Sequence, residues 1–210
     1  MLTRKGQSIE DESMRIIDDE IGPHQYDKLE WPIVRRVIHA TADFDFAGEN
    51  KIIFHKDAVT NGINALKEGH SIVVDVNGVI GGLNKQNPKD FGNKLICNIS
   101  DPDLAEQAKK ENKTRAQMSM RVVASEMNGG IVAIGNAPTA LLEIIQMISE
   151  KVTKPALVVG IPVGFVAAAE SKEKLQTSDV PFITNVGRKG GSSCAASIVN
   201  ALYKLLRESS

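Results

Sequence analysis

Three glycine-containing segments carry the groups with the clearest potential for chemistry. They are residues 135–140 (GNAPTA), 160–165 (GIPVGF) and 187–193 (GRKGGSS), and each follows a short apolar run. Glycine lets backbone N–H groups approach a ligand, and a helix that starts at such a segment offers further unpaired N–H groups to an anion. Arg188 and Lys189 add positive charge. The pattern predicts a site for a ligand with several carboxylates or phosphates.

These segments do not match the nucleotide-binding motifs. None has the spacing of a Walker phosphate loop, and none has the G-x-G-x-x-G fingerprint of dinucleotide-binding folds. A single glycine turn often reflects turn chemistry alone, whereas three at one shared edge favour a ligand site. The candidate contacts in these segments are Gly135, Asn136, Thr139, Arg188, Gly190, Gly191 and Ser192.

His39 is the candidate for acid–base chemistry among the four histidines. No histidine pair has metal-ligand spacing, and no H-E-x-x-H motif occurs. On a helix, Arg35 and Arg36 share a surface with His39, and their charges lower its pKa. A bound polycarboxylate reverses this effect, which suits a residue that gives and takes a proton near neutral pH. Local context alone leaves open the alternative of an ordinary histidine at a helix end.

The elements that position these residues alternate along the chain. Apolar runs predict strands at residues 71–75, 95–99, 131–134, 156–159 and 182–186, and residues 51–55 form a shorter β-like run. Helices are predicted at residues 9–20 (capped by Ser8), 31–40, 57–68, 114–127, 138–150, 170–175 and 192–206, with a helical stretch opening at residue 101. We expect one α/β domain over residues 1–210, with N-terminal helices and a mostly parallel, doubly wound sheet covered by helices on both faces. Its strand-to-helix loops then share one edge, where such folds bind ligands.

The composition is that of an ordinary globular protein. Of 210 residues, 42% are hydrophobic and 24% charged, and the formal net charge is −1. We therefore expect no nucleic-acid partner and no membrane partner. The two distant cysteines, Cys97 and Cys194, favour a reducing compartment over a disulfide framework. The N-terminus lacks the apolar core of a signal peptide, so we expect a cytoplasmic protein. No metal or cofactor motif is present in the sequence.

The sequence resembles the precorrin-8X (cobalt-precorrin-8) methylmutase family of cobalamin biosynthesis over about residues 13–201. The resemblance rests on ordered segments: residues 36–40 (RVIHA), 112–115 (NKTR, with one residue inserted), 132–141 (VAIGNAPTAL), 160–172 (GIPVGFVAAAESK) and 187–192 (GRKGGS). It implies an isomerase that moves a methyl group from carbon eleven to carbon twelve of the macrocycle, giving hydrogenobyrinate or cobyrinate, without cofactor or methyl donor.

The resemblance also assigns roles. It implies that His39 is the acid–base residue, that Ser13 and Arg115 lie near the tetrapyrrole polycarboxylate, and that the protein is a homodimer with active sites near the interface. The sequence departs from the family at residues 77–83 (NGVIGGL), where a methionine–valine pair is usual, so Asn84 and Lys85 are only candidate contacts there. Ala167 stands where glycine is common. Cys194 stands where methionine is common, and we interpret it as a packing residue.

Two alternatives remain from the sequence. One is a non-catalytic tetrapyrrole-binding or carrier protein on the same fold, for which a histidine at position 39 would be unnecessary. The other is an α/β enzyme acting on a phosphorylated metabolite, against which the missing nucleotide and phosphate motifs count. The sequence does not distinguish the cobalt-containing substrate from the metal-free one.

Overall fold

The computed structural model describes residues 3–209 and contains a six-stranded sheet. The strand order is β1-β6-β5-β4-β2-β3, in which β1 is antiparallel to β6 and the other neighbours are parallel. The strands are β1 Ile52–Phe54, β2 Ile72–Val74, β3 Leu95–Ile96, β4 Ile131–Ile134, β5 Leu157–Gly160 and β6 Phe182–Asn185. This confirms the predicted α/β fold with a mostly parallel sheet.

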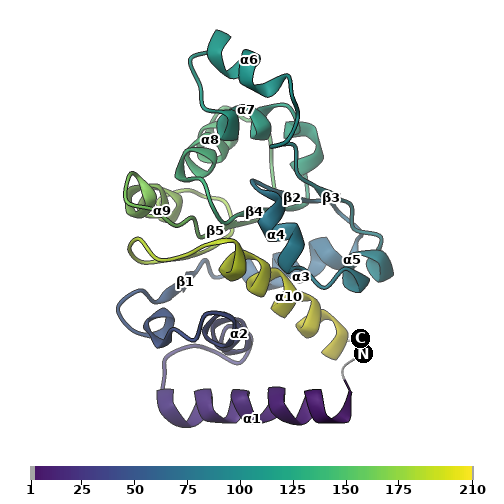
Figure 1. The fold of residues 1–210 in the computed structure, drawn as a ribbon, viewed down its shortest axis with the longest axis vertical. Coiled ribbons are helices and arrows are strands. Elements are labelled where there is room, and N and C mark those ends of the chain that lie inside the picture. The colour runs from purple at the N-terminus through teal and green to yellow at the C-terminus, as the bar shows by residue number, and fades with distance from the viewer. Residues whose placement is uncertain (1–2, 210) are drawn as a thin grey trace.

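Helices cover both faces of this sheet (Figure 1). Strands β2, β4, β5 and β6 are buried along their whole length, which explains why they read as continuous apolar runs. The helices are α1 Arg4–Ile21, α2 Trp31–Thr41, α3 Ala58–Lys67, α4 Asn77–Gly82, α5 Gln86–Phe91, α6 Leu104–Lys110, α7 Arg115–Arg121, α8 Pro138–Ser149, α9 Ala168–Gln176 and α10 Ser192–Glu208, with 3-10 turns η1 Phe44–Ala47 and η2 Ala124–Met127.

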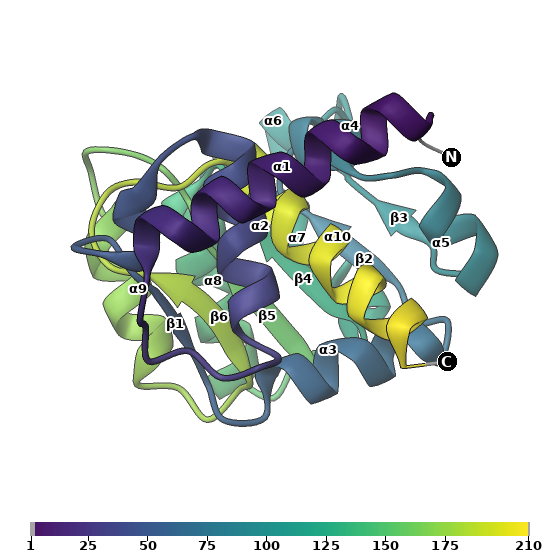
Figure 2. The same cartoon turned by 90° about the horizontal axis from the view of Figure 1, so that it is seen from below.

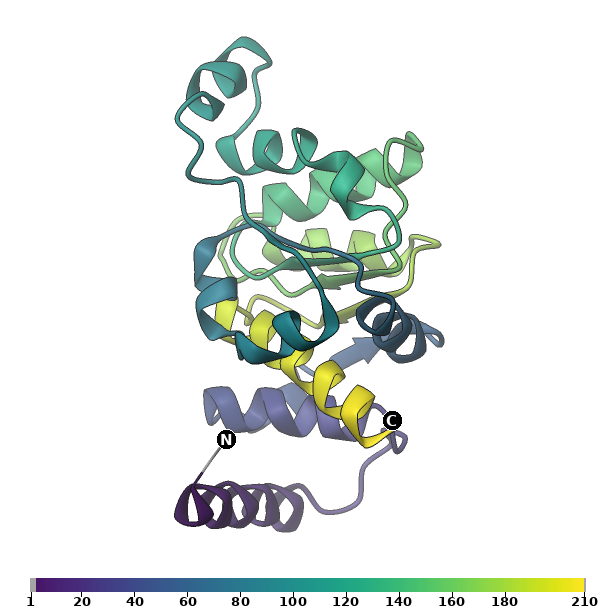
Figure 3. The same cartoon turned by 90° about the vertical axis from the view of Figure 1, so that its right-hand side faces the viewer.

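Helix α10 is the centre of one face. It packs on the sheet and also against α2, α3 and α4. Helices α7, α8 and α9 cover the other face, and α1 and α6 lie at opposite ends of the molecule (Figures 1 and 3). In Figure 2, α1 crosses over α2 and α10 as an outer layer. Within residues 3–209, no helix is both long enough and apolar enough to cross a membrane.

Several local predictions were wrong. Helix α1 starts at Arg4 rather than residue 9, because Thr3 accepts a hydrogen bond from the N–H of Gly6 and caps it, leaving Ser8 inside the helix. Helix α7 ends at Arg121, and η2 follows it within the range predicted as one helix. Residues 77–82 (NGVIGG), where no helix was predicted, form α4, because packing against α10 outweighs the poor helix propensity of glycine. Helix α5 was not predicted.

The strand order places a topological switch point between β2 and β4. From β2 the chain goes to β3 on one side and then crosses to β4 on the other side. The loops after these two strands therefore diverge at the carboxyl edge of the sheet. In open α/β folds this switch point is where ligands bind.

The first prediction concerns Ala167, the residue before α9. Its φ is +60°, a left-handed conformation that an alanine adopts only at a cost. We expect Ala167→Gly to raise the free energy of unfolding by about 0.5–1 kcal/mol in chemical denaturation. The control is Ala168→Gly, one residue further and inside α9, which should lower it. Equal destabilisation by both variants would contradict the strain at Ala167.

Candidate active site

A buried carboxylate lies at the switch point between β2 and β4. Asp75 is fully buried, and it accepts hydrogen bonds from the N–H groups of Gly135 (3.0 Å), Asn136 (2.8 Å) and Ala137 (2.7 Å). Burial raises the pKa of Asp75, while these three donors oppose the rise. The N–H groups that we expected to meet an anionic ligand are therefore already bound to an anion of the protein. A ligand contact from Asn136 has to use its exposed side chain.

This role of Asp75 was not predicted from the sequence. The available signal was a charged residue at the end of a buried apolar strand, immediately before the switch point. Such a charge is retained in a core only where hydrogen bonds satisfy it. Its partners lie 60 residues away in the sequence, so the pairing is visible only in the folded chain.

The three glycine segments meet at the carboxyl edge, as expected from a parallel sheet. A Cβ on Gly135 would lie 2.8 Å from the Cα of Ser192, so the loops after β4 and β6 touch. A Cβ on Gly190 would lie 2.3 Å from the carbonyl oxygen of Ile161, and the N–H of Gly191 donates to the same oxygen at 3.0 Å. These glycines serve close packing between loops, which side chains would prevent.

Thr139 and Arg115 lie at the same edge. The hydroxyl of Thr114, the N-cap of α7, donates to the hydroxyl of Thr139 at 3.2 Å. Arg115 is exposed and donates one hydrogen bond to the carbonyl of Ile99 at 2.7 Å. Its guanidinium is thus held beside the loop after β4, with donors left over for a carboxylate.

Lys189 and Arg188, the two basic residues after β6, differ in whether their charge is paired within the chain. The ammonium of Lys189 contacts Asp43 (2.8 Å) and Asp45 (2.6 Å), and these carboxylates raise its pKa. Its charge is thus neutralised within the chain. Arg188 is exposed, and no residue in the range 3–209 forms an ion pair with it. Arg188 is therefore the cation of this loop that remains available to an anionic ligand.

His39 lies near the end of α2 and is half-buried. Its pKa is lowered first by burial and then by the charge of Arg36, while Glu10 opposes the shift. Arg36 is itself paired with Glu10 of α1 at 2.7 Å. Within the described part of the chain, the imidazole has no hydrogen-bond partner. Because its pKa is lowered, the imidazole is uncharged at neutral pH. Both ring nitrogens are available to a ligand, since no described residue binds them.

Arg35 does not act on His39 as we expected. Its guanidinium donates to Asp18 of α1 at 2.6 Å, and Trp31 donates to the same carboxylate at 2.9 Å. Burial and Arg36 alone lower the pKa of His39. Ser13 lies on α1, one turn after Glu10, and its hydroxyl donates to the carbonyl of Ile9 at 2.8 Å. The ion pair between Arg35 and Asp18 holds α1, which carries Ser13, against α2, which carries His39.

The predicted residues fall into two sets within this chain. His39 and Ser13 belong to the α1–α2 pair, while the glycine loops, Thr139 and Arg115 belong to the carboxyl edge of the sheet. The segment after α2 links the two sets, because Asp43 and Asp45 bind Lys189 of the loop after β6. No group of three or more His, Cys, Asp or Glu residues suited to a metal ion was found in residues 3–209.

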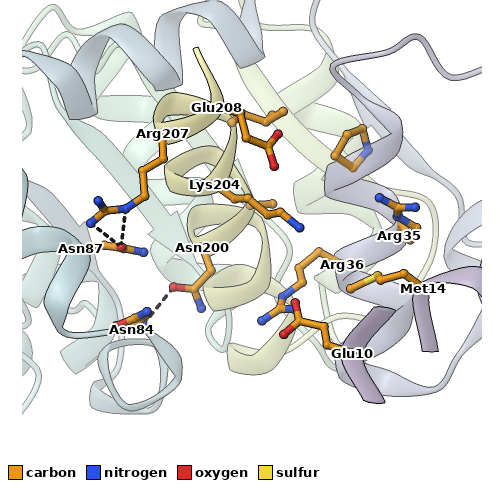
Figure 4. A pocket seen from close by; sticks show the side chains of 13 residues that line it. Glu10, Met14, Arg35, Arg36, Asn84, Asn87, Asn200, Lys204, Arg207 and Glu208 are labelled. Atoms are coloured by element: carbon orange, nitrogen blue, oxygen red, sulfur yellow. Dashed lines mark hydrogen bonds and ion pairs between the residues drawn. The ribbon is translucent and has the colours of Figure 1, made fainter. Parts of the chain in front are cut away.

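A cavity of about 430 Å³ opens between α1, α2, the second half of α10 and residues 84–87 (Figure 4). Arg36 and Lys204 point into it from α2 and α10. Asn84 lines the cavity, and its N–H donates to the side chain of Asn200 at 3.0 Å. Lys85 instead lines a separate hollow that includes Lys94. Of the two candidates in this region, only Asn84 therefore shares a cavity with Arg36, the neighbour of His39.

Comparisons with known proteins agree along the length of the chain. The family model described as precorrin-8X methylmutase matches residues 8–205. The cobalt-precorrin-8 methylmutase of Priestia megaterium is 50% identical over 96% of this chain and 88% of its own length, and that of Leptospira interrogans is 48% identical over 97% and 96%. The solved structure of the precorrin-8x methyl mutase from Thermus thermophilus superposes with a TM-score of 0.90 at 40% identity, covering 97% of this chain and 98% of that one.

The second prediction tests the electrostatics around His39. Arg36→Gln should raise the pKa of His39, because it removes a neighbouring positive charge. Glu10→Gln should lower that pKa further, because it removes the opposing negative charge. NMR titration of the imidazole protons measures both, with His39→Gln used to assign the resonance. Arg15→Gln, on the exposed side of α1, is the control and should leave the titration unchanged. A shift of the same sign in the Arg36 and Glu10 variants would rule out this arrangement of charges.

Proposed function

The chain belongs to the precorrin-8X methylmutase family and is an isomerase of cobalamin biosynthesis, and we propose that it moves a methyl group from carbon eleven to carbon twelve of cobalt-precorrin-8. The observation that carries the proposal is a 50% identity to a cobalt-precorrin-8 methylmutase that spans 96% of the chain. The relative from Leptospira interrogans, at 48%, carries the same name, which favours the cobalt-containing substrate. The migrating group stays within one molecule, so the reaction needs no methyl donor.

We propose that His39 is the general acid and base of this rearrangement. In the free protein its imidazole is uncharged, partly because Arg36 lowers its pKa. When a carboxylate of the substrate binds near Arg36, it offsets that charge, the pKa of His39 rises and the ring takes up a proton from solvent. The imidazolium then protonates the macrocycle beside the migration site and recovers the proton after the shift. In this proposal, binding of the substrate generates the imidazolium form of His39 that donates the proton.

The remaining polar groups bind and orient the substrate in this proposal. Arg115 and Arg188 form charge-assisted hydrogen bonds with peripheral carboxylates, and such bonds fix orientation as well as adding affinity. The hydroxyl groups of Thr139 and Ser192 and the side chain of Asn136 supply further donors at the same edge. An intramolecular shift depends mainly on a held conformation and one placed proton donor. A site in which several donors bind carboxylates and His39 alone transfers the proton is suited to such a shift.

A carrier protein is the less favoured candidate. The curated relatives are named as methylmutases, and the match to them covers nearly the full chain. A carrier also has no need of a half-buried imidazole whose ring nitrogens have no hydrogen-bond partner within residues 3–209. The absence of a nucleic-acid partner and the cytoplasmic location stay predictions from the sequence.

We also propose that the protein is a homodimer that associates through α1. This helix of 18 residues buries only Ile17 within the chain. Ile9 and Ile16 remain 60% and 42% exposed on it. Two apolar side chains seven positions apart share one helix face, which is a suitable surface for a second copy. Ser13 lies between them, so the interface would also bring this predicted substrate contact close to the second chain.

The third prediction tests the dimer. Replacing both Ile9 and Ile16 with lysine should give a monomer in analytical ultracentrifugation, because it adds like charges to the apolar face of α1. Val152→Lys is the matched control, since Val152 is 47% exposed in the turn after α8, and it should leave the sedimentation coefficient unchanged. A wild-type protein that sediments as a monomer at micromolar concentration would contradict the proposal.

The fourth prediction tests the reaction. Wild-type protein should convert cobalt-precorrin-8 faster than metal-free precorrin-8X, with a change in the visible spectrum as the product forms. His39→Ala should bind the substrate but turn it over at least about a hundredfold more slowly, because it removes the proton donor. His55→Ala, at a half-buried histidine after β1, serves as the control. Binding by wild-type protein without a spectral change would support the carrier, and near-normal turnover by His39→Ala would remove His39 from its role.

A further inference from the structure

Lys172 of α9 is a buried lysine with no carboxylate partner in residues 3–209. Its side chain lies beneath the loop after β6, and the residue is only 1% exposed. The ammonium donates to the carbonyl of Gly187 at 2.9 Å and to the carbonyl of Lys189. Burial lowers the pKa of Lys172 to about 8. Burying an ammonium without a counter-ion is costly. The placement of Lys172 against these two carbonyls therefore needs a functional reason.

A second buried donor binds the same loop from the same side. The side-chain amide of Asn185 donates to the carbonyls of Val186 (2.8 Å) and Lys189 (3.0 Å). Its own oxygen, Oδ1, is buried and has no partner among the described residues. The amide is therefore oriented for its donors, although this leaves an acceptor unsatisfied. Together, Lys172 and Asn185 hold three carbonyl groups of the loop towards the protein interior.

The orientation of these carbonyls determines where the N–H groups point. In a trans peptide the C=O and N–H bonds lie on opposite sides, and all peptide bonds in the described residues are trans. Inward carbonyls at Val186, Gly187 and Lys189 therefore turn the following N–H groups outward. No described residue accepts a hydrogen bond from the N–H groups of residues 187–190. A run of outward N–H groups forms a concavity suited to an anion.

Other contacts hold the flanks of the loop. The N–H of Gly164 donates to the carbonyl of Arg188 at 3.3 Å, and Gly191 is bound to Ile161. These contacts fix the position of the loop, whereas Lys172 and Asn185 fix which way its peptide groups turn. The side chain of Arg188 is exposed on the outer side. The loop thus presents N–H groups and the guanidinium of Arg188, which forms no ion pair with the described residues.

We propose that Lys172 is a positioning residue for substrate binding: it holds the carbonyl groups of Gly187 and Lys189 inward and so directs the following N–H groups and Arg188 at a carboxylate of the tetrapyrrole. Lys172 does not touch the substrate. Its buried charge also lies beneath the loop, where it favours an anion above it. The inference rests on the proposed function, because that function supplies a polycarboxylate as the ligand.

The test is Lys172→Met, which keeps the length of the side chain and removes the donors. With cobalt-precorrin-8, well below the unfolding temperature, KM should rise about tenfold or more while kcat changes less than about threefold, because ground-state binding is lost and the acid–base residue is untouched. Lys172→Arg, which keeps donors at this position, should give a KM closer to that of the wild type. Lys174→Met is the matched control on the exposed side of the same helix and should change neither constant by more than about twofold.

An unchanged KM in folded Lys172→Met would overturn the proposal, as would a loss of kcat alone. If that variant does not fold, Arg188→Gln gives the answer, because it alters only an exposed side chain. Its KM should rise without a change in melting temperature, and an unchanged KM there would also overturn the proposal. A wild-type protein inactive on both substrates would instead contradict the proposed function.

Discussion

The carboxylate of Asp75 is buried directly after β2 and accepts hydrogen bonds from three successive N–H groups, those of Gly135, Asn136 and Ala137, in the loop between β4 and α8. These bonds join the two strands whose loops diverge at the switch point. Backbone N–H groups that are removed from water need an acceptor, and for the loop before α8 the side chain of Asp75 is that acceptor. The loop after β4 is fixed by these bonds, and the close approach of Gly135 to Ser192 then fixes its distance from the loop after β6. The geometry of the carboxyl edge therefore depends on this one buried charge.

Several other charges of the site are also paired within the protein. Lys189 is neutralised by Asp43 and Asp45, and Arg35 and Arg36 are bound by Asp18 and Glu10. These ion pairs are half-exposed, so each contributes little stability by itself. Their main effect is on position, since they hold α1 on α2 and join the segment after α2 to the loop after β6. Among residues 3–209 Arg188 has no ion-pair partner, so it is available to a polycarboxylate.

Both the position and the pKa of His39 depend on neighbouring charges. Its helix is fixed through the neighbouring arginines, and its pKa is set by burial together with Arg36 and Glu10. A residue in this environment responds to any anion that approaches Arg36. The chemistry of the site and its affinity for carboxylates are thus linked through one side chain. The cavity beside Arg36, with Lys204 facing it, extends this electrostatic environment away from the sheet edge (Figure 4).

The sequence by itself determined the fold class, the shared edge of the three glycine loops and the family, because strand burial, turn glycines and ordered motifs are local signals. It did not determine α4, since the propensity of Gly78, Gly81 and Gly82 argues against a helix that only packing on α10 stabilises. The start of α1 depended on a single cap at Thr3. Only the tertiary structure showed that Asp75 occupies the N–H groups of Gly135 and Asn136, that Lys189 is neutralised, and that Lys172 lies buried beneath the loop after β6. Each of these facts is a contact between residues far apart in the chain, and electrostatic and hydrogen-bond partners depend on distance in space, which sequence spacing does not encode.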